Sequence, residues 1–234
     1  MTGPPDDGEV QLAEAFAEVA RSLLAEHSVE ETLRRICSLA VETIDGCDHA
    51  GISLITSRRV ETHGASDEVP ELVDFIQYES SEGPCLDAIR DHEVFHVNDL
   101  EVEERWPNFA RRAADETGVR SMLSFRLFAE ENTMGALNLY SRAASAFDAE
   151  ADRVGAVFAA HAAVALKAAR QSEAQAIAIE TRDVIGQAKG ILMARQGISE
   201  PEAFEVLRQA SQRLNVKLRD VAEQVSRNQP RRPA

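Results

Sequence analysis

The stretch "VRSMLSFRLFAEENTMGALNLYS", Val119 to Ser141, contains two runs of aliphatic and aromatic residues separated by a polar segment near Glu130–Thr133. Runs of this composition on either side of turn residues are typical of two strands in a hairpin. Shorter strand signals lie further out, in "GISLI" (Gly51–Ile55), "RRVETHG" (Arg58–Gly64) and "EVFHVNDL" (Glu93–Leu100). We therefore expect a central antiparallel sheet.

Helical patterns surround these strands. Apolar residues three and four positions apart predict helices over Glu9–Ala25 and Glu30–Ile44. A short helix is expected in "PELVDFIQY" (Pro70–Tyr78), another in "RWPNFARRAADETG" (Arg105–Gly118), and a long one from Phe147 to about Met193. Helices flanking an antiparallel sheet make the predicted fold class α+β.

The charge is divided unevenly along the chain. The net charge is −15, but from Arg170 to Ala234 eleven Lys and Arg stand against eight Asp and Glu, a balance of +3. The preceding residues therefore carry −18. Such a break indicates two domains with different partners, of which only the C-terminal one suits a polyanion such as nucleic acid.

Membrane insertion and secretion are not expected. The N-terminal "MTGPPDDGEV" is acidic and lacks the basic and apolar regions of a signal peptide, and the longest apolar run, Val154–Leu166, is too short to span a bilayer. Three cysteines, Cys37, Cys47 and Cys85, form no CxxC motif and suit a reducing compartment. The prediction is a cytoplasmic protein, with Cys85 either an inert core thiol or a reactive one.

One motif suggests a zinc site that its context excludes. "HEVFH" (His92–His96) has the H-E-x-x-H spacing, which needs a helix to bring both histidines to one metal. The surrounding residues favour a strand, in which positions four apart stand about 13 Å apart. We expect ordinary strand histidines and no metal.

Two longer stretches resemble a GAF domain, namely Ser81–Phe128, beginning "SEGPCLDAIRDHEVFH", and "MGALNLYSRAASAFDAEA" (Met134–Ala151). The resemblance covers residues 8–168 and is closest to GAF domains that actinobacteria join to an RNA-binding module. It implies a central antiparallel sheet with helices on either side, often around a small-molecule cavity. We interpret Cys85 and Trp106 either as lining such a ligand pocket or as core packing.

The GAF resemblance leaves the sensed signal open. Cyclic nucleotides, haem, bilins and protein contacts all occur in the family, and the sequence has no evident bilin or haem signature, so no cofactor is expected. A few GAF-fold proteins are thiol reductases for methionine sulfoxide, and the three cysteines keep that alternative open. The favoured prediction is a sensor without catalytic residues.

The long helix has an apolar seam at alternating spacings of three and four, as in coiled coils. Its positions are Val154, Val157, His161, Val164 and Ala168, and it resumes at Ile177, Val184 and Ile185. Two interpretations are equally open: packing on the chain's own sheet, or a parallel homodimer through the helix over residues 154–185.

The segment Thr181–Val225 resembles an ANTAR domain along nearly its whole length. The matching elements are "AKGILM" (188–193), "GIS" (197–199), "EAF" (202–204), "LR" (207–208) and "LRDVA" (218–222). The resemblance implies a small three-helix module that binds paired RNA stem-loops and prevents a terminator hairpin from forming.

The residues themselves fit three short helices. Gly197 ends the first, and Ser199 with Glu202 forms a capping box that begins the second. The second is predicted to turn one apolar face inward, made of Ala203, Phe204, Leu207, Ala210 and Leu214. The third is predicted to bury Leu218, Val221, Ala222 and Val225.

Basic residues are left on the outside of this module. The candidate RNA-binding residues are Lys189, Arg195, Arg208, Arg213, Lys217 and Arg219. Gly190, beside Lys189, would allow another helix or backbone to approach closely. A merely solvated basic face and a DNA-binding helix-turn-helix are the alternatives.

The sequence thus predicts an RNA-binding transcription antiterminator with a GAF sensor. Its expected organisation is a disordered N-terminus (1–8), a GAF domain (9–168), a helical linker (169–180), an ANTAR domain (181–226) and a basic tail (227–234). Its expected partners are RNA stem-loops, a second copy of the chain and an unidentified small molecule.

Overall fold

The computed structural model describes residues 21, 28–56, 59–91, 94–129 and 132–227, and it divides into an N-terminal unit (1–171) and a C-terminal unit (172–234). The helix predicted over Glu9–Ala25 lies outside the described residues, except that Arg21 is helical. The predicted disordered N-terminus lies outside them too, as does the predicted basic tail apart from Arg227.

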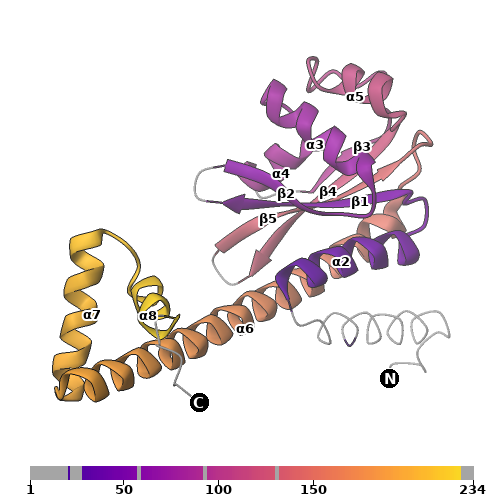
Figure 1. The fold of residues 1–234 in the computed structure, drawn as a ribbon. Coiled ribbons are helices and arrows are strands. Elements are labelled where there is room, and N and C mark those ends of the chain that lie inside the picture. The colour runs from indigo at the N-terminus through magenta and orange to yellow at the C-terminus, as the bar shows by residue number, and fades with distance from the viewer. Residues whose placement is uncertain (1–20, 22–27, 57–58, 92–93, 130–131, 228–234) are drawn as a thin grey trace, which may run out of the picture. The chain divides into compact units, whose positions relative to one another are not determined.

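The N-terminal unit is built on one five-stranded sheet in the order β2-β1-β5-β4-β3, with every neighbouring pair antiparallel (Figure 1). The strands are β1 (His49–Thr56), β2 (Arg59–Ala65), β3 (Phe95–Val97), β4 (Ser121–Ala129) and β5 (Asn132–Ser141). The hairpin predicted from the sequence is β4 and β5, which pair with Leu123 opposite Leu139. The α+β prediction is confirmed.

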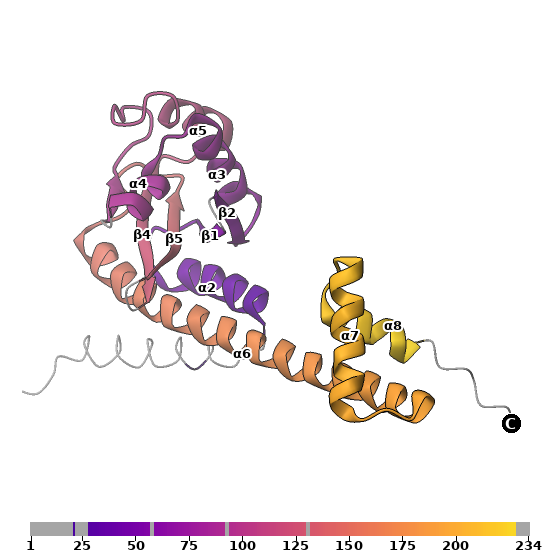
Figure 2. The same ribbon diagram turned by 90° about the vertical axis from the view of Figure 1, so that its left-hand side faces the viewer.

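Helices cover both faces of the sheet (Figures 1 and 2). One face packs against α2 (Val29–Thr43) and the first part of α6 (Ala149–Gln196), and the other against α3 (Glu68–Ser80), α4 (Pro84–Asp91) and α5 (Ala110–Thr117). Because side chains alternate along a strand, β5 sends Leu137 and Leu139 into the α2–α6 core and Tyr140 into the opposite core.

Two elements are shorter than the sequence predicts, and one helix was not predicted. β3 covers only three residues of the strand expected over Glu93–Leu100, and α5 only the second half of its predicted range, ending at Gly118 in the left-handed region (φ 73°). Helix α4 has no counterpart among the predictions, although its first residue, Pro84, is a favoured helix start.

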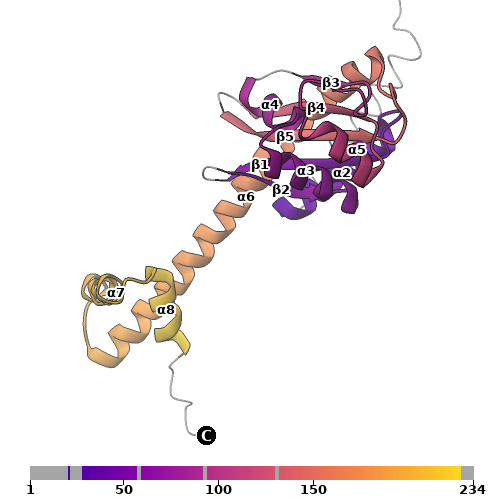
Figure 3. The same ribbon diagram turned by 90° about the horizontal axis from the view of Figure 1, so that it is seen from above.

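The C-terminal unit consists of the end of α6, α7 (Glu200–Leu214) and α8 (Leu218–Arg227) (Figure 3). Its core residues are Ala188, Leu192, Ala203, Leu207, Val221 and Ala222. The capping box of Ser199 and Glu202 is confirmed, and Gly197 ends α6 with φ 66°. The inward face predicted for α8 is also confirmed.

The predicted inward face of α7 is too wide. Phe204 and Leu214 are 41% and 59% exposed, so their predicted burial is wrong. Helix α7 packs through a narrow stripe around Ala203 and Leu207, and both larger residues lie beside it. Gly190 likewise has no neighbour among the described residues within 4 Å of where a Cβ atom would lie, so none of them makes the close approach expected there.

Candidate functional site

A fully buried carboxylate lies between the sheet and α3. Five side-chain donors surround Asp74 at 2.7 to 3.2 Å: Gln77 and Tyr140 on Oδ1, and Ser53, Thr62 and Tyr78 on Oδ2. Burial raises the pKa of Asp74, and the hydrogen bonds only partly offset this rise. Two carboxylate oxygens offer about four lone-pair sites, so this acceptor is saturated. The network fixes α3 on β1, β2 and β5.

Cys85 of α4 joins the edge of this network. Its Sγ–H donates to Ser53 Oγ (3.3 Å), which also accepts from Asn138 Nδ2 (3.1 Å). The remaining amide oxygen of Asn138 and the hydroxyl of Ser124, its opposite residue on β4, are fully buried and have no partner within the described residues. A ligand entering beneath α4 would meet these two polar atoms.

Trp106 lies in the same covering layer, just before α5. Its indole N–H donates to Asp87 Oδ2 (2.8 Å), the ring of Phe95 meets it edge-on at 5.9 Å, and the Arg105 guanidinium lies 4.4 Å from its ring centroid. Trp106 and Cys85 are both buried, and each contributes to packing. The structure places them in the core, and their predicted role in a ligand pocket stays a prediction.

Two surface cavities are lined by other residues. One, of about 210 Å³, lies between the end of α2 and the start of α6, beside Asp45, Asp148 and Glu150. The other, of about 240 Å³, is mainly apolar and lies beside Phe125 and Phe128. Neither was anticipated from the sequence.

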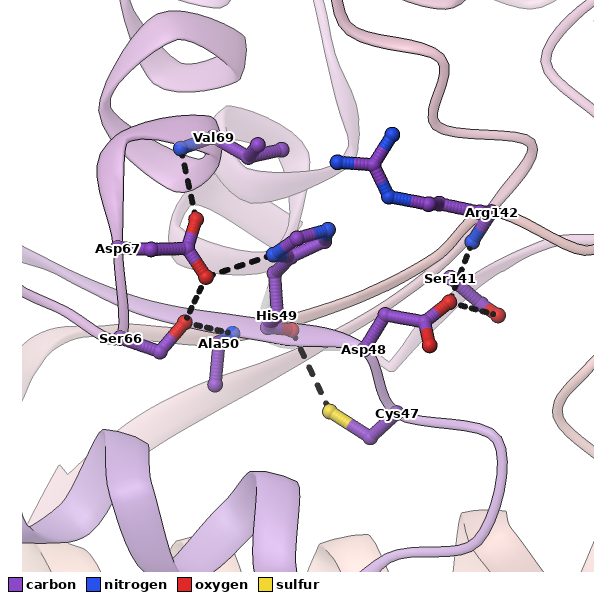
Figure 4. A network of polar contacts seen from close by, with 9 residues as sticks. All are labelled: Cys47, Asp48, His49, Ala50, Ser66, Asp67, Val69, Ser141 and Arg142. Carbon is purple, nitrogen blue, oxygen red and sulfur yellow. Dashed lines mark hydrogen bonds and ion pairs between the residues drawn. The ribbon is translucent and has the colours of Figure 1, made fainter.

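A second polar network joins the start of β1 to the start of α3 (Figure 4). His49 Nδ1 lies 2.7 Å from Asp67 Oδ2, which also accepts from Ser66 Oγ, while Asp67 Oδ1 accepts the backbone N–H of Val69 and so caps α3. Burial raises the pKa of Asp67, but the hydrogen bonds from His49, Val69 and Ser66 outweigh it and hold the pKa below its usual range. The Nε2 atom of His49 is buried and has no hydrogen-bond partner in the part of the chain that the structure describes.

The three cysteines are free and buried. Burial is the main cause that raises the pKa of each thiol, Cys37, Cys47 and Cys85, to about 12. A reactive cysteine needs a thiolate near neutral pH. The structure therefore favours the inert-core interpretation of Cys85 over a nucleophile.

The histidine motif forms no metal site in the part of the chain that the structure describes. His96 lies on β3, as the sequence predicts, with Nδ1 3.5 Å from Asp152 Oδ1 of α6, while His92 lies outside the described residues. No three His, Cys, Asp or Glu side chains among those described are grouped closely enough to hold a metal ion.

Three of the six predicted RNA-binding residues form ion pairs with carboxylates. The ion pairs are Lys189 with Glu200 (2.5 Å), Arg208 with Glu205 (2.6 Å), and Arg219 with both Glu180 and Glu223 (3.0 Å each). The hydrogen bond from Arg208 lowers the pKa of Glu205 to about 2. A phosphate that approaches these cations competes with a carboxylate that already compensates their charge.

The other three candidates differ among themselves. Arg195 has an interaction partner within the chain. Arg213 and Lys217 are exposed, and neither forms an ion pair with any residue that the structure describes. They flank the turn between α7 and α8, so the structure brings together two of the six predicted residues as unpaired cations.

The predicted seam on α6 divides between two environments. Val154 packs against the sheet core, whereas Val157 and Val164 are 43% and 63% exposed. His161 directs Nδ1 to the carbonyl oxygen of Val157 (2.8 Å). Packing of α6 on the chain's own sheet explains the position of Val154. It leaves Val157 and Val164 on an exposed face of the helix.

Comparison with protein families gives two matches. The GAF domain profile matches residues 26–167, and the ANTAR domain profile matches residues 174–225. No curated protein matches the chain. Among the described residues, no helix has the length and apolar character needed to cross a membrane.

Solved structures share the fold of the N-terminal unit. The GAF domain of a phosphoenolpyruvate-protein phosphotransferase from Acinetobacter superposes with a TM-score of 0.56 at 16% identity, covering 71% of this chain and 97% of its own. A free methionine-R-sulfoxide reductase from Neisseria meningitidis, in complex with its substrate, gives 0.54 at 16% identity, covering 74% and 98%. At such identities the similarity concerns the fold alone.

Proposed function

The chain belongs to the GAF domain family, and from this premise we propose that it is a signal-responsive, RNA-binding transcription antiterminator. The GAF domain responds to a signal, and the ANTAR domain binds paired RNA stem-loops and so keeps a terminator hairpin from forming. The protein acts in the cytoplasm, without a catalytic step.

One observation carries this proposal. The ANTAR profile matches the C-terminal unit, which is also the part of the chain with more basic than acidic residues. The profile covers residues 174–225, and the positive balance of +3 falls on residues 170–234. Nucleic-acid binding draws much of its affinity from cations that neutralise phosphates. The GAF part, with a balance of −18, repels a phosphate backbone and has no share in the binding.

A homodimer belongs to the proposal, because paired stem-loops call for two binding modules. The exposed side chains of Val157 and Val164 on α6 supply an apolar face for a second copy of the chain. Burying such side chains at an interface is favourable, at about 25 cal/mol per Å² of apolar surface.

The decisive experiment compares ligands on the purified full-length protein. A fluorescent RNA with two stem-loops should bind at least tenfold more tightly than a DNA duplex of similar length in the same buffer. The same RNA should increase read-through when placed before a terminator in a transcription reaction containing the protein. Preference for the DNA duplex would identify a DNA-binding regulator instead.

A further inference from the structure

The turn between α7 and α8 carries two exposed cations that have no carboxylate partner among the described residues. Arg213 is the penultimate residue of α7 and Lys217 precedes α8, and neither forms an ion pair within the described residues. Asp220, the nearest carboxylate along the chain, pairs with neither of them. Resting on the proposed function, we infer that this turn is the primary phosphate-contacting surface of the C-terminal unit.

The backbone of the turn is held in one conformation. Asn215 adopts a left-handed conformation (φ 52°), which asparagine tolerates better than most residues, and its N–H bonds back to Gln212 and Ser211. Ser211 Oγ donates to the carbonyl oxygen of Val216 (2.6 Å), whose own N–H donates to the Ser211 carbonyl oxygen (3.2 Å). Arg213 and Lys217 therefore project from an ordered platform, which reduces the entropy lost on binding.

Exposed apolar side chains accompany these cations. Leu214 is 59% exposed and Val216 is 39% exposed, so the turn offers aliphatic surface between two positive charges. Single-stranded loops present unstacked bases beside phosphates, and such a surface can meet both.

The carboxylate-paired cations contribute less, because a carboxylate already compensates the charge of each one. Arg208 donates from both Nε (2.8 Å) and Nη2 (2.6 Å) to the two oxygens of Glu205. If a phosphate replaces Glu205 as the partner of this guanidinium, the negative charge of the Glu205 carboxylate remains next to the phosphate without a cation to balance it. Glu205 and Glu200 thus act as built-in competitors of RNA, and removing such a carboxylate should strengthen binding.

The test uses matched substitutions in the full-length protein and one probe, an RNA of two stem-loops joined by a short single strand. Phosphate contacts are largely independent of sequence, so this RNA reports on them even without the natural target. Each neutralised phosphate contributes a log–log salt slope of about 0.7–0.9, which at 0.1 M salt is about a five- to eightfold change in Kd. Arg213→Gln and Lys217→Gln should each weaken binding by this factor and flatten the slope accordingly.

Three comparison variants separate contact from net charge. Arg208→Gln should change Kd by less than twofold, although it removes the same charge from the same helix. Arg182→Gln removes another exposed cation that has no ion pair in the described structure, and it should also have less than a twofold effect. Glu205→Gln should tighten binding by at least twofold, because Arg208 is then released. Circular dichroism melting verifies that each variant is folded.

The outcomes distinguish this inference from the proposed function. If Arg208→Gln or Arg182→Gln weakens RNA binding as much as Arg213→Gln does, the turn has no special role. RNA affinity unaffected by Arg213→Gln and Lys217→Gln also overturns it, while the RNA-binding proposal stands. If those two variants change the mass measured by light scattering instead, the turn is a protein contact. Failure of the wild-type protein to bind the RNA overturns both.

Discussion

Lys189 of α6 and Glu200 of α7 are joined across the corner between the two helices, where Lys189 Nζ donates to Glu200 Oε1 at 2.5 Å. The pair is formed because Gly197, with φ 66°, turns the chain sharply after α6 and brings the start of α7 back beside it. Lys189 is thereby held along its own domain, with only 23% of its side chain exposed.

Glu200→Gln should release Lys189 for RNA. We expect Kd for the two-stem-loop RNA to fall by about two- to fivefold at 0.1 M salt, since one further phosphate can be neutralised at most. Fluorescence anisotropy measures this. Glu202→Gln is the matched control, because it removes a charge from the same helix end while its amide oxygen can still accept from the Ser199 N–H. An equal gain in both variants would show that net charge, and not release of Lys189, sets the affinity.

Asp74→Ala should destabilise the N-terminal unit by about 3–5 kcal/mol, because it leaves five donors, three of them fully buried, without their acceptor. Thr62→Val removes a single donor of the same network and should cost only about 1 kcal/mol. Urea unfolding followed by fluorescence of Trp106, the single tryptophan, reports on this unit selectively. Similar losses in the two variants would contradict a hub centred on Asp74.

Acid should weaken the same unit through Asp67. Its folded pKa lies below the unfolded value, so its stabilisation is complete above the unfolded value near 3.9 and disappears as pH falls through the folded pKa. The Trp106 unfolding midpoint should therefore begin to decline as pH falls toward about 4 and continue to decline below it. Asp67→Asn should lower the midpoint at pH 6 and flatten this decline, whereas an unchanged slope would assign the acid sensitivity to other carboxylates.

The native thiols should not react. Because all three are buried and have pKa values near 12, Cys37, Cys47 and Cys85 remain neutral at pH 7. A disulfide reagent should therefore detect almost no thiol in the folded protein and all three in urea. Rapid reaction of one native thiol, abolished by Cys85→Ala, would revive the reductase alternative.

Charge on the exposed part of the α6 seam should separate the proposed dimer. Val157→Glu combined with Val164→Glu should halve the mass measured by light scattering, because two carboxylates per chain would have to be buried at the interface. Ala176→Glu, at an exposed position of the same helix outside the three-and-four register of the seam, should leave the mass unchanged. A double variant that keeps the dimer mass and a native circular dichroism spectrum would locate the contact elsewhere.

Local patterns predicted most of the elements, because strands and helices follow from spacing along the chain. The β4–β5 hairpin, the end of α5 at Gly118 and the capping box at Ser199 are all encoded within a few neighbouring residues. Helix α4 was missed because eight residues hold too few apolar positions for a helical period to stand out.

Contacts between distant segments were beyond such reasoning. The donors to Asp74 come from β1, β2, α3 and β5, and no spacing along the sequence reveals that they converge. The pairing of Arg208 with Glu205 is different, since residues three apart on a helix are neighbours and this ion pair could have been anticipated. Four of the basic residues are exposed as predicted, whereas Lys189 and Arg219 are half-buried. Whether each charge is already compensated by a carboxylate depends on the fold.

The hub at Asp74 also limits how related sequences can diverge. A donor such as Thr62 can be exchanged alone, because the other four still compensate the carboxylate. Asp74 itself can be replaced only if several of its donors are replaced by apolar residues, either beforehand or at the same time. Substitutions at Ser53, Thr62, Tyr78 and Tyr140 should therefore be strongly epistatic with position 74, and lineages that lost the aspartate should have lost most of its donors as a group.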